Sequence, residues 1–414
     1  MSFSILVYFI LSLFSVFFGI IYFLHPKTSS VSFLLFALLL PTSNQFMEFI
    51  SYSGVYFYDY FFLLITIQYI IKLCLQENII KSNIYNIVFF VLFFLFYLSL
   101  AVTSSVSFDK YLLRDLRPFL TLLYGIISIS LARKNLISVK WMLNVLILTF
   151  IFKLVFFAFL YFGVSFSDVY YQNNIFRYFD ASTFVAALFL IVTIFKKKSF
   201  LSKASKYKLN LTVFLAIIVV LMSNLRIILI ALLVIYLFIH HRNLFKKILI
   251  GFSSIFMFLI YSYLMGSERV MNAIDFQEIL IQLAARFSPA LEKIAGMNLE
   301  QYIYGLGLGT YFEIPWFEYR GLDSKLNTID STYLTFFVKF GLFSIGLLVL
   351  FFRILLQNVR DVLLKRALIL FYLILFITLS VLYQSGAILH ILFLNMLMIS
   401  INNENTSHSL SINP

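Results

Sequence analysis

Four charged residues stand in segments of the sequence that are otherwise apolar or aromatic. Arg177 follows a stretch rich in Tyr and Asn, Arg226 interrupts a long apolar run, and Arg286 lies on an amphipathic stretch. Asp330 opens a further apolar run. Guanidinium groups bind phosphate and stabilise developing negative charge, while a carboxylate can accept a proton from a hydroxyl group. These residues therefore predict a catalytic site for an anionic substrate.

Each of the four also has a purely structural explanation. Arg226 could be an interfacial arginine whose side chain extends to the membrane surface, and Arg286 could lie on the solvated face of a helix. Arg177 could pair with Asp180 where the next helix begins, and Asp330 could cap the helix that follows it. The sequence leaves both explanations open at each position.

Further candidates for substrate binding lie near these charges. Asp180 is expected to cap the following helix with Ser182 and Thr183, and its carboxylate is also a candidate substrate contact. The Tyr and Phe residues around it would suit stacking on sugar rings, although the aromatic belt of a membrane protein predicts the same residues. Gly305 and Gly307 lie in a stretch, 304–310, that superficially resembles a phosphate loop. No βαβ pattern surrounds it, so nucleotide binding is excluded and we expect tight turns or close approach to a ligand.

The composition determines which elements must position these residues. Of the 414 residues, 62% are hydrophobic and 12% are charged, and the mean hydropathy is +0.99. A soluble protein carries about 25% charged residues, and a disordered one has low hydrophobicity, so both classes are excluded. We expect an all-α polytopic membrane protein, with residues 1–414 forming a single integral-membrane domain in the lipid bilayer. No metal ion or cofactor is expected, since Cys74 is the only cysteine and no pair of histidines has metal-ligand spacing.

Long apolar runs give about 12 to 13 transmembrane helices. The region 209–240 is too long for one span, so we expect a hairpin that turns within the membrane, with Arg226 near the start of its second arm. The candidate spans are 3–24, 30–41, 55–73, 84–104, 118–132, 141–162, 179–195, 209–222, 227–240, 248–265, 330–352, 367–384 and 388–400.

The net charge of +13 is explained by membrane topology. Lys and Arg concentrate in segments that we therefore assign to the cytoplasmic side, so no nucleic acid is needed as a partner. The N-terminus is then expected outside. The cytoplasmic segments are 25–29, 74–83, 133–140, 196–208, 241–247, 353–366 and the C-terminal tail.

The opposite, periplasmic side is expected to carry one long loop, 266–329. Apolar residues recur at helical spacing from Phe276 to Ile294, which predicts an amphipathic helix over 274–295. Pro289 is expected to kink this helix or to divide it in two. We expect the loop to be ordered, mostly helical, and to cover a cavity on the outer face.

Taken in chain order, these features resemble the O-antigen ligase/polymerase superfamily. The features are Ser-x-x-Arg at 223–226, Arg286 in a long loop ahead of Gly305-x-Gly307, Asp330 followed by Tyr333-Leu334, and Phe-Gly-Leu-Phe-Ser-Ile-Gly at 340–346.

The resemblance implies a GT-C-like fold and transfer of an undecaprenyl-pyrophosphate-linked oligosaccharide at the periplasmic face of the bacterial inner membrane. Undecaprenyl pyrophosphate would leave, without a nucleotide sugar or a metal ion. Tyr333 would bind substrate, and a chain-length regulator protein would be a candidate partner. The ligase branch carries a histidine near the position of Asp330, and no histidine occurs in 242–389. The O-antigen polymerase (Wzy-type) branch is therefore favoured.

Three other classes of membrane protein compete with a polymerase. An O-antigen ligase would transfer the glycan to lipid A-core, and a lipid-linked oligosaccharide flippase is expected to have two related halves and short loops. A metal-dependent transferase is expected to have paired carboxylates in an early outer loop, whereas Glu48 and Asp59 are separated and no Asp-x-Asp occurs. The ligase and the flippase stay as alternatives, and activity is expected to survive chelation.

Overall fold

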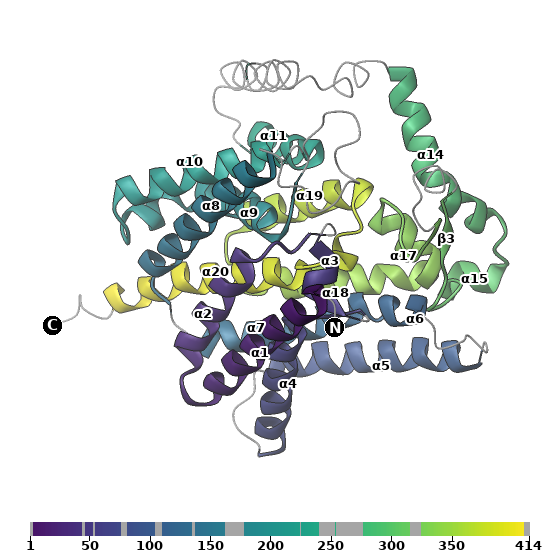
Figure 1. Cartoon of the computed structure of the whole chain (residues 1–414), viewed down its shortest axis with the longest axis horizontal. Coiled ribbons are helices and arrows are strands. Elements are labelled where there is room, and N and C mark those ends of the chain that lie inside the picture. The colour runs from purple at the N-terminus through teal and green to yellow at the C-terminus, as the bar shows by residue number, and fades with distance from the viewer. Residues whose placement is uncertain are drawn as a thin grey trace.

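The computed structural model is almost entirely helical in the part of the chain that it describes (Figure 1). It describes residues 3–43, 46–52, 54–75, 81–103, 110–134, 137–161, 178–223, 225–239, 253, 276–314 and 324–409. The helices are α1 (Phe3–Leu24), α2 (Pro26–Leu39), α3 (Met47–Ile50), α4 (Asp59–Cys74), α5 (Lys81–Thr103), α6 (Lys110–Asp115), α7 (Arg117–Lys134), α8 (Val139–Tyr161), α9 (Ala181–Leu201), α10 (Lys206–Met222), α11 (Arg226–Ile239), α14 (Phe276–Ala295), α15 (Leu299–Tyr304), α17 (Thr332–Phe340), α18 (Ser344–Leu356), α19 (Val362–Thr378) and α20 (Ala387–Ser409). The other elements are the 3-10 helices η3 (Gly341–Phe343) and η4 (Val381–Tyr383), and the antiparallel pairs β1 (Ser51–Tyr52) with β2 (Val55–Tyr56) and β3 (Phe312–Glu313) with β4 (Lys325–Leu326).

The all-α prediction is confirmed, and helices form where the apolar runs predict them. Within the described ranges, three helical stretches are long and apolar enough to cross a membrane: Phe3–Leu24, Val139–Leu160 and Thr332–Leu356. Shorter apolar helices include Pro26–Leu39, Tyr85–Ala101, Arg226–Leu237 and Ala387–Asn402. The run 248–265 lies outside the described residues except for Ser253, so the number of about 12 to 13 spans stays a prediction.

The first helix, α1, exposes its apolar side and buries its small and polar side. Leu13 is 67% exposed, whereas Ser12, Ser15 and Gly19 face the protein. A helix on the surface of a soluble protein has the reverse arrangement, with its apolar stripe turned inward. The outward apolar face of α1 therefore suits contact with lipid.

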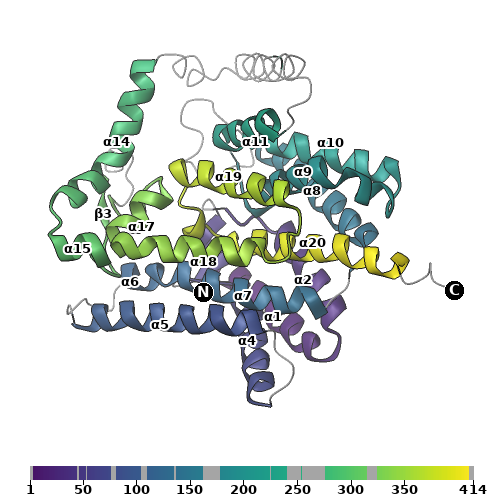
Figure 2. The ribbon, with the colours of Figure 1, turned by 180° about the vertical axis from the view of Figure 1, so that it is seen from behind.

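The last helix, α20, runs through the centre of the molecule and packs against α7 and α9 (Figures 1 and 2). Its residues from Ala387 to Ile401 are all buried, including His390, Asn395 and Ser400. Asn395 and Ser400 satisfy their side chains through the carbonyls of the preceding turn. At one end of the molecule lie α14, α15, α17 and the β3–β4 pair, and α20 ends at the opposite end (Figure 1).

Two elements that concern the candidate site lie where the sequence predicts them. α10 and α11 form the expected hairpin, and Arg226 is the first residue of α11. α14 falls within the predicted range 274–295 and runs as one helix through Pro289, not as two. Pro289 cannot donate to the carbonyl of Ala285, and the hydroxyl of Ser288 donates to that oxygen instead, at 3.1 Å.

Candidate functional site

The structure brings together two of the predicted catalytic residues, Arg286 of α14 and Asp330, which lies just before α17. Arg286 Nη1 is 3.6 Å from Asp330 Oδ2, and the side chains are 42% and 63% exposed. Asp330 does not cap α17, because the hydroxyl of Ser331 accepts the hydrogen bond from the N–H of Leu334. The carboxylate is therefore turned toward Arg286 and stays accessible to a substrate.

Apolar packing fixes the part of α14 that carries Arg286. The helix contributes Phe287, Ala290 and Ile294 to a buried cluster, in partial agreement with the predicted stripe, whereas Leu291 is 51% exposed. The remaining members of this cluster are Met297, Leu306, Phe312, Ile314, Leu326, Ile329, Leu334 and Val338. The long loop is thus held against α17 by an apolar core of its own.

The predicted glycines, Gly305 and Gly307, lie in a turn that follows α15 and contacts the end of α17. The N–H of Gly307 donates to the carbonyl of Lys339 at 3.0 Å. Gly305 has a φ of +81°, and an added Cβ would lie 2.3 Å from the backbone of Lys339, so only glycine fits this approach. Gly307 has a φ of +85°, but no atom of the described residues lies within 4 Å of an added Cβ. Within the described part of the chain, nothing fills the position of that Cβ, although Gly307 itself is buried.

A buried ion pair that was not predicted from the sequence lies inside this turn. Lys339 Nζ is 2.5 Å from Asp115 Oδ1 and 2.7 Å from the carbonyl of Thr310, and both charged side chains are fully buried. The N–H of Gly309 and the side-chain amide of Asn327 donate to the same carboxylate, at 2.8 and 3.3 Å. A buried pair is tolerated only when its remaining polar atoms are hydrogen-bonded. Asp115 therefore holds α6, α17 and the long loop together.

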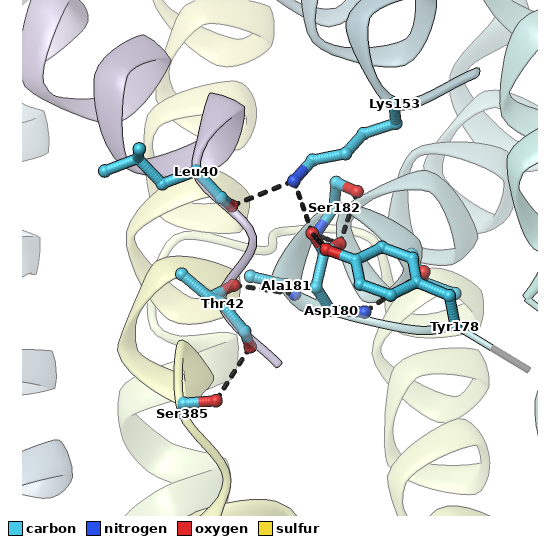
Figure 3. Close-up of polar contacts among 9 residues, drawn as sticks. Leu40, Thr42, Lys153, Tyr178, Asp180, Ala181, Ser182 and Ser385 are labelled. Carbon is cyan, nitrogen blue, oxygen red and sulfur yellow. Dashed lines mark hydrogen bonds and ion pairs between the residues drawn. The ribbon is translucent and has the colours of Figure 1, made fainter. Parts of the chain in front are cut away.

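Asp180 caps α9 as predicted. Its Oδ1 accepts from the N–H and the hydroxyl of Ser182 at 2.9 and 2.5 Å, and Thr183 completes the capping box. Its Oδ2 accepts from the hydroxyl of Tyr178 at 2.9 Å and from the ammonium group of Lys153 (Figure 3). An ionised carboxylate has about four acceptor positions, so those of Asp180 are all used in this arrangement.

Lys153 was not predicted, although it is central to this arrangement. Its ammonium group also donates to the carbonyl of Leu40 at 2.8 Å, and its side chain is 2% exposed. Thr42 continues the contacts: it accepts from the N–H of Ala181 at 3.1 Å, and its carbonyl accepts from the hydroxyl of Ser385 at 2.7 Å (Figure 3). The segments before α3, α9 and α20 are thereby joined.

A third buried pair, Asp59 with Arg117, lies next to these segments. Arg117 Nη1 is 2.8 and 2.9 Å from the two oxygens of Asp59, and Nη2 donates to the hydroxyl of Tyr58 at 2.5 Å. That hydroxyl accepts from the N–H of Gly386 at 3.0 Å. The guanidinium carbon also lies 4.3 Å from the ring centroid of Tyr56. The connecting segments that meet in these contacts are the ones that the charge distribution assigns to the outer face.

The remaining candidates are only partly placed. Arg177 lies outside the described residues, so its place in the catalytic site stays a prediction. Met222, at the end of α10, packs against a cluster of Phe46, Phe157, Leu160 and Tyr178, which brings the hairpin turn close to the start of α9. The hydroxyl of Tyr333 donates to the carbonyl of Leu373 at 3.0 Å, which joins α17 to α19.

The two buried lysines that were not predicted could have been found from the sequence. Lys153 and Lys339 both lie within predicted spans, where an ionisable residue is costly and needs a partner. Their partners are 27 and 224 residues away in sequence, and only the fold brings them together. In chemical terms, an accessible Arg–Asp pair can bind an anion and accept a proton, while the buried pair of Asp115 and Lys339 holds α17 and the long loop together. Among the described residues, no group of three or more His, Cys, Asp or Glu could hold a metal ion.

Comparison with known proteins gives one family. A search of curated proteins and a search of solved structures returned no match. Residues 124–407 match a family of unknown function, DUF6369. The matched region contains Lys153, Asp180, Arg286, Asp330 and Lys339 but begins after α6. Because the match covers most of its length, the chain belongs to the DUF6369 family.

Proposed function

We propose that this chain is a polysaccharide polymerase, an integral-membrane glycosyltransferase that acts on undecaprenyl-pyrophosphate-linked oligosaccharide. The chain order of its motifs supports this function. The observation that carries the proposal is the 3.6 Å pair of Arg286 and Asp330, because these two motif residues lie on either side of the glycine turn in sequence and come together in the structure. Helices long and apolar enough to cross a membrane are consistent with a lipid-linked substrate.

The proposed reaction needs one anion-stabilising group and one proton acceptor. A hydroxyl oxygen of the acceptor sugar bonds to the anomeric carbon of the donor, and the bond from that carbon to the pyrophosphate oxygen breaks. The bonding electrons leave with the pyrophosphate, whose negative charge Arg286 stabilises together with Arg226 and Arg177. The hydroxyl proton passes to Asp330. No metal ion or cofactor takes part in this scheme.

The proposed setting is the bacterial inner membrane, with the site facing the periplasm and a GT-C-like arrangement of helices around it. A chain-length regulator protein is a further proposed partner. Asp180 and Tyr333, whose described contacts are within the protein, would support the site or exchange one of these contacts for substrate. Of the two glycines, Gly307 is the better placed for a substrate contact, since no described atom lies where its Cβ would be.

A flippase is the second candidate, and the buried ion pairs favour it. Lys153–Asp180, Lys339–Asp115 and Arg117–Asp59 are all nearly inaccessible to solvent. Buried ionisable residues in membrane helices often mark ion or proton pathways in transporters. An O-antigen ligase is the third candidate, and Asp330 in place of the ligase histidine argues against it.

The test is complementation of a strain that lacks the gene, with variants at the exposed pair. Arg286→Lys, Arg286→Ala and Asp330→Asn are each expected to reduce polymerisation by about 100-fold. Arg286→Ala removes the group that stabilises the leaving pyrophosphate, and Asp330→Asn removes the proton acceptor. Arg286→Lys keeps the charge, but an ammonium group cannot reproduce the bidentate geometry of a guanidinium group. Arg366→Ala serves as the control, since Arg366 is an exposed arginine of α19 on the predicted cytoplasmic side. The readout is the glycan ladder at equal membrane abundance.

The phenotype of the deletion strain separates the candidate functions. A polymerase defect leaves one repeat unit on each lipid anchor, whereas loss of a ligase or a flippase leaves no attached repeats. If Arg286→Ala and Asp330→Asn both give a wild-type ladder at normal abundance, the exposed pair is not the catalytic site and the proposal fails.

A further inference from the structure

We propose that Lys293, Tyr311 and Lys325 form a second anion-binding site, which takes a carboxylate or phosphate group carried by the glycan. This inference rests on the proposed function for the identity of the glycan. The ammonium groups of Lys293 and Lys325 lie 5.4 and 5.0 Å from the centroid of the Tyr311 ring. The Tyr111 ring lies 5.3 Å from Tyr311 and supports it from α6. One aromatic ring therefore holds two positive charges from different elements, α14 and β4.

Charge at this site favours an anion. The positive charge of Lys293 repels that of the buried Lys339. Lys339 is close to the site, because its ammonium group lies 5.9 Å from the ring of Phe312, which follows Tyr311 in the chain. Asp115 neutralises Lys339, and Glu313 stands opposite Lys325 in the β3–β4 pair. Lys293 makes no ion pair in the part of the chain that the structure describes, and it is only partly exposed. Lys293 therefore keeps a positive charge beside the Tyr311 ring, which would stabilise an anion bound there.

The position of the site distinguishes it from the catalytic pair. Arg286 and Lys293 are two turns apart, so they lie on the same face of α14 and are separated by about 10 Å along its axis. The Arg286 guanidinium group lies against Asp330, whereas the Lys293 ammonium group lies over the Tyr311 ring, so the two cations have different partners. With Arg286 at the pyrophosphate, Lys293 and Lys325 are placed to contact the sugars, which implies that the repeat unit bears an acidic sugar or a phosphate substituent.

The experiment measures binding to the purified full-length chain in nanodiscs of phosphatidylcholine, which carries no net charge. The probes are a tetrasaccharide of alternating glucuronic acid and N-acetylglucosamine, its carboxyl-reduced neutral form, and inorganic pyrophosphate. The variants are Lys293→Gln and Lys325→Gln, with Lys197→Gln as the control at an exposed lysine of α9. We expect the wild-type chain to bind the acidic probe at least tenfold more tightly than the neutral one. Lys293→Gln and Lys325→Gln should each bind the acidic tetrasaccharide about tenfold more weakly, which is a typical effect of losing one charge pair.

Two results would overturn the inference. One is equal binding of the acidic and the neutral tetrasaccharide by the wild-type chain. The other is loss of pyrophosphate binding, but not of tetrasaccharide binding, in Lys293→Gln, which would assign the lysines to the carrier and not to the sugars. Because the readout is binding, it stands apart from the complementation test. If the chain supports a normal glycan ladder but binds the acidic and neutral tetrasaccharides equally, only this inference is rejected. If it binds the acidic tetrasaccharide more tightly but does not support polymerisation, only the proposed function is rejected.

Discussion

At the residue scale, Lys153 and Asp180 show how one buried pair fixes several helices. Asp180 caps α9, Lys153 lies on α8, and the same ammonium group reaches the carbonyl of Leu40 at the end of α2. Both side chains are nearly inaccessible to solvent, so neither charge can find water if its partner is lost. The energetic consequence is asymmetric, because removing one partner leaves the other charge buried and unpaired.

We therefore predict that Lys153→Met destabilises the protein by about 3 to 5 kcal/mol. The double variant Lys153→Met with Asp180→Asn should recover part of this loss, since asparagine keeps the cap of α9 without a charge. Thermal unfolding of the purified protein in detergent measures both, with Lys197→Met as the exposed control. If the double variant is no more stable than Lys153→Met alone, the unpaired charge of Asp180 is not what destabilises Lys153→Met.

At the element scale, the long loop is attached to the helices through backbone contacts as much as through side chains. The turn after α15 donates to the carbonyls of Val338 and Lys339, and the backbone of Gly305 approaches α17 too closely for any other residue. Gly341, which follows α17, approaches the backbone of Ile303 in α15 equally closely. Two glycines thus set the distance between α15 and the break between α17 and α18.

We predict that Gly305→Ala detaches this turn, with a cost of more than about 2 kcal/mol from backbone overlap and positive φ together. Gly307→Ala is the matched control, since Gly307 has a similar φ but no described atom within 4 Å of the added Cβ, and this change should cost only about 1 to 2 kcal/mol. Limited proteolysis of the loop and thermal unfolding report the difference. Equal effects of the two substitutions would mean that the close approach to Lys339 is not what holds the turn.

The elements were largely predictable from the sequence, and their contacts were not. Apolar runs and helical spacing predict α1, the α10–α11 hairpin and α14, because these patterns are local. The Ser and Thr residues after Asp180 predict its cap for the same reason. The break at Gly341, by contrast, lies inside one continuous apolar run, and the partners of Lys153 and Lys339 are distant in sequence. The pair of Arg286 and Asp330 was expected only in the sense that both residues belong to one site.

At the scale of the whole molecule, polar contacts gather in two places. One is formed by the segments around Asp59, Asp115, Asp180 and Asp330, all assigned to the outer face by the charge distribution. The other includes Lys196 and Asp361, 2.8 Å apart, from segments assigned to the cytoplasm. The ammonium group of Lys196 holds the pKa of the Asp361 carboxyl below its usual value. This separation matches a protein in which alternate connections lie on opposite sides of a membrane.

Sidedness can be tested with the single cysteine of the chain. Cys74 is exposed at the end of α4, in a segment that we assign to the cytoplasm. We predict that a membrane-impermeant maleimide labels the wild-type chain only after spheroplasts are permeabilised. In a Cys74→Ser background, Glu300→Cys should be labelled in intact spheroplasts, because Glu300 is exposed on α15 in the loop assigned to the outer face. Labelling of Cys74 but not of Glu300→Cys in intact spheroplasts would invert the topology. Arg286 and Asp330 would then lie on the cytoplasmic side, where the proposed periplasmic reaction could not take place.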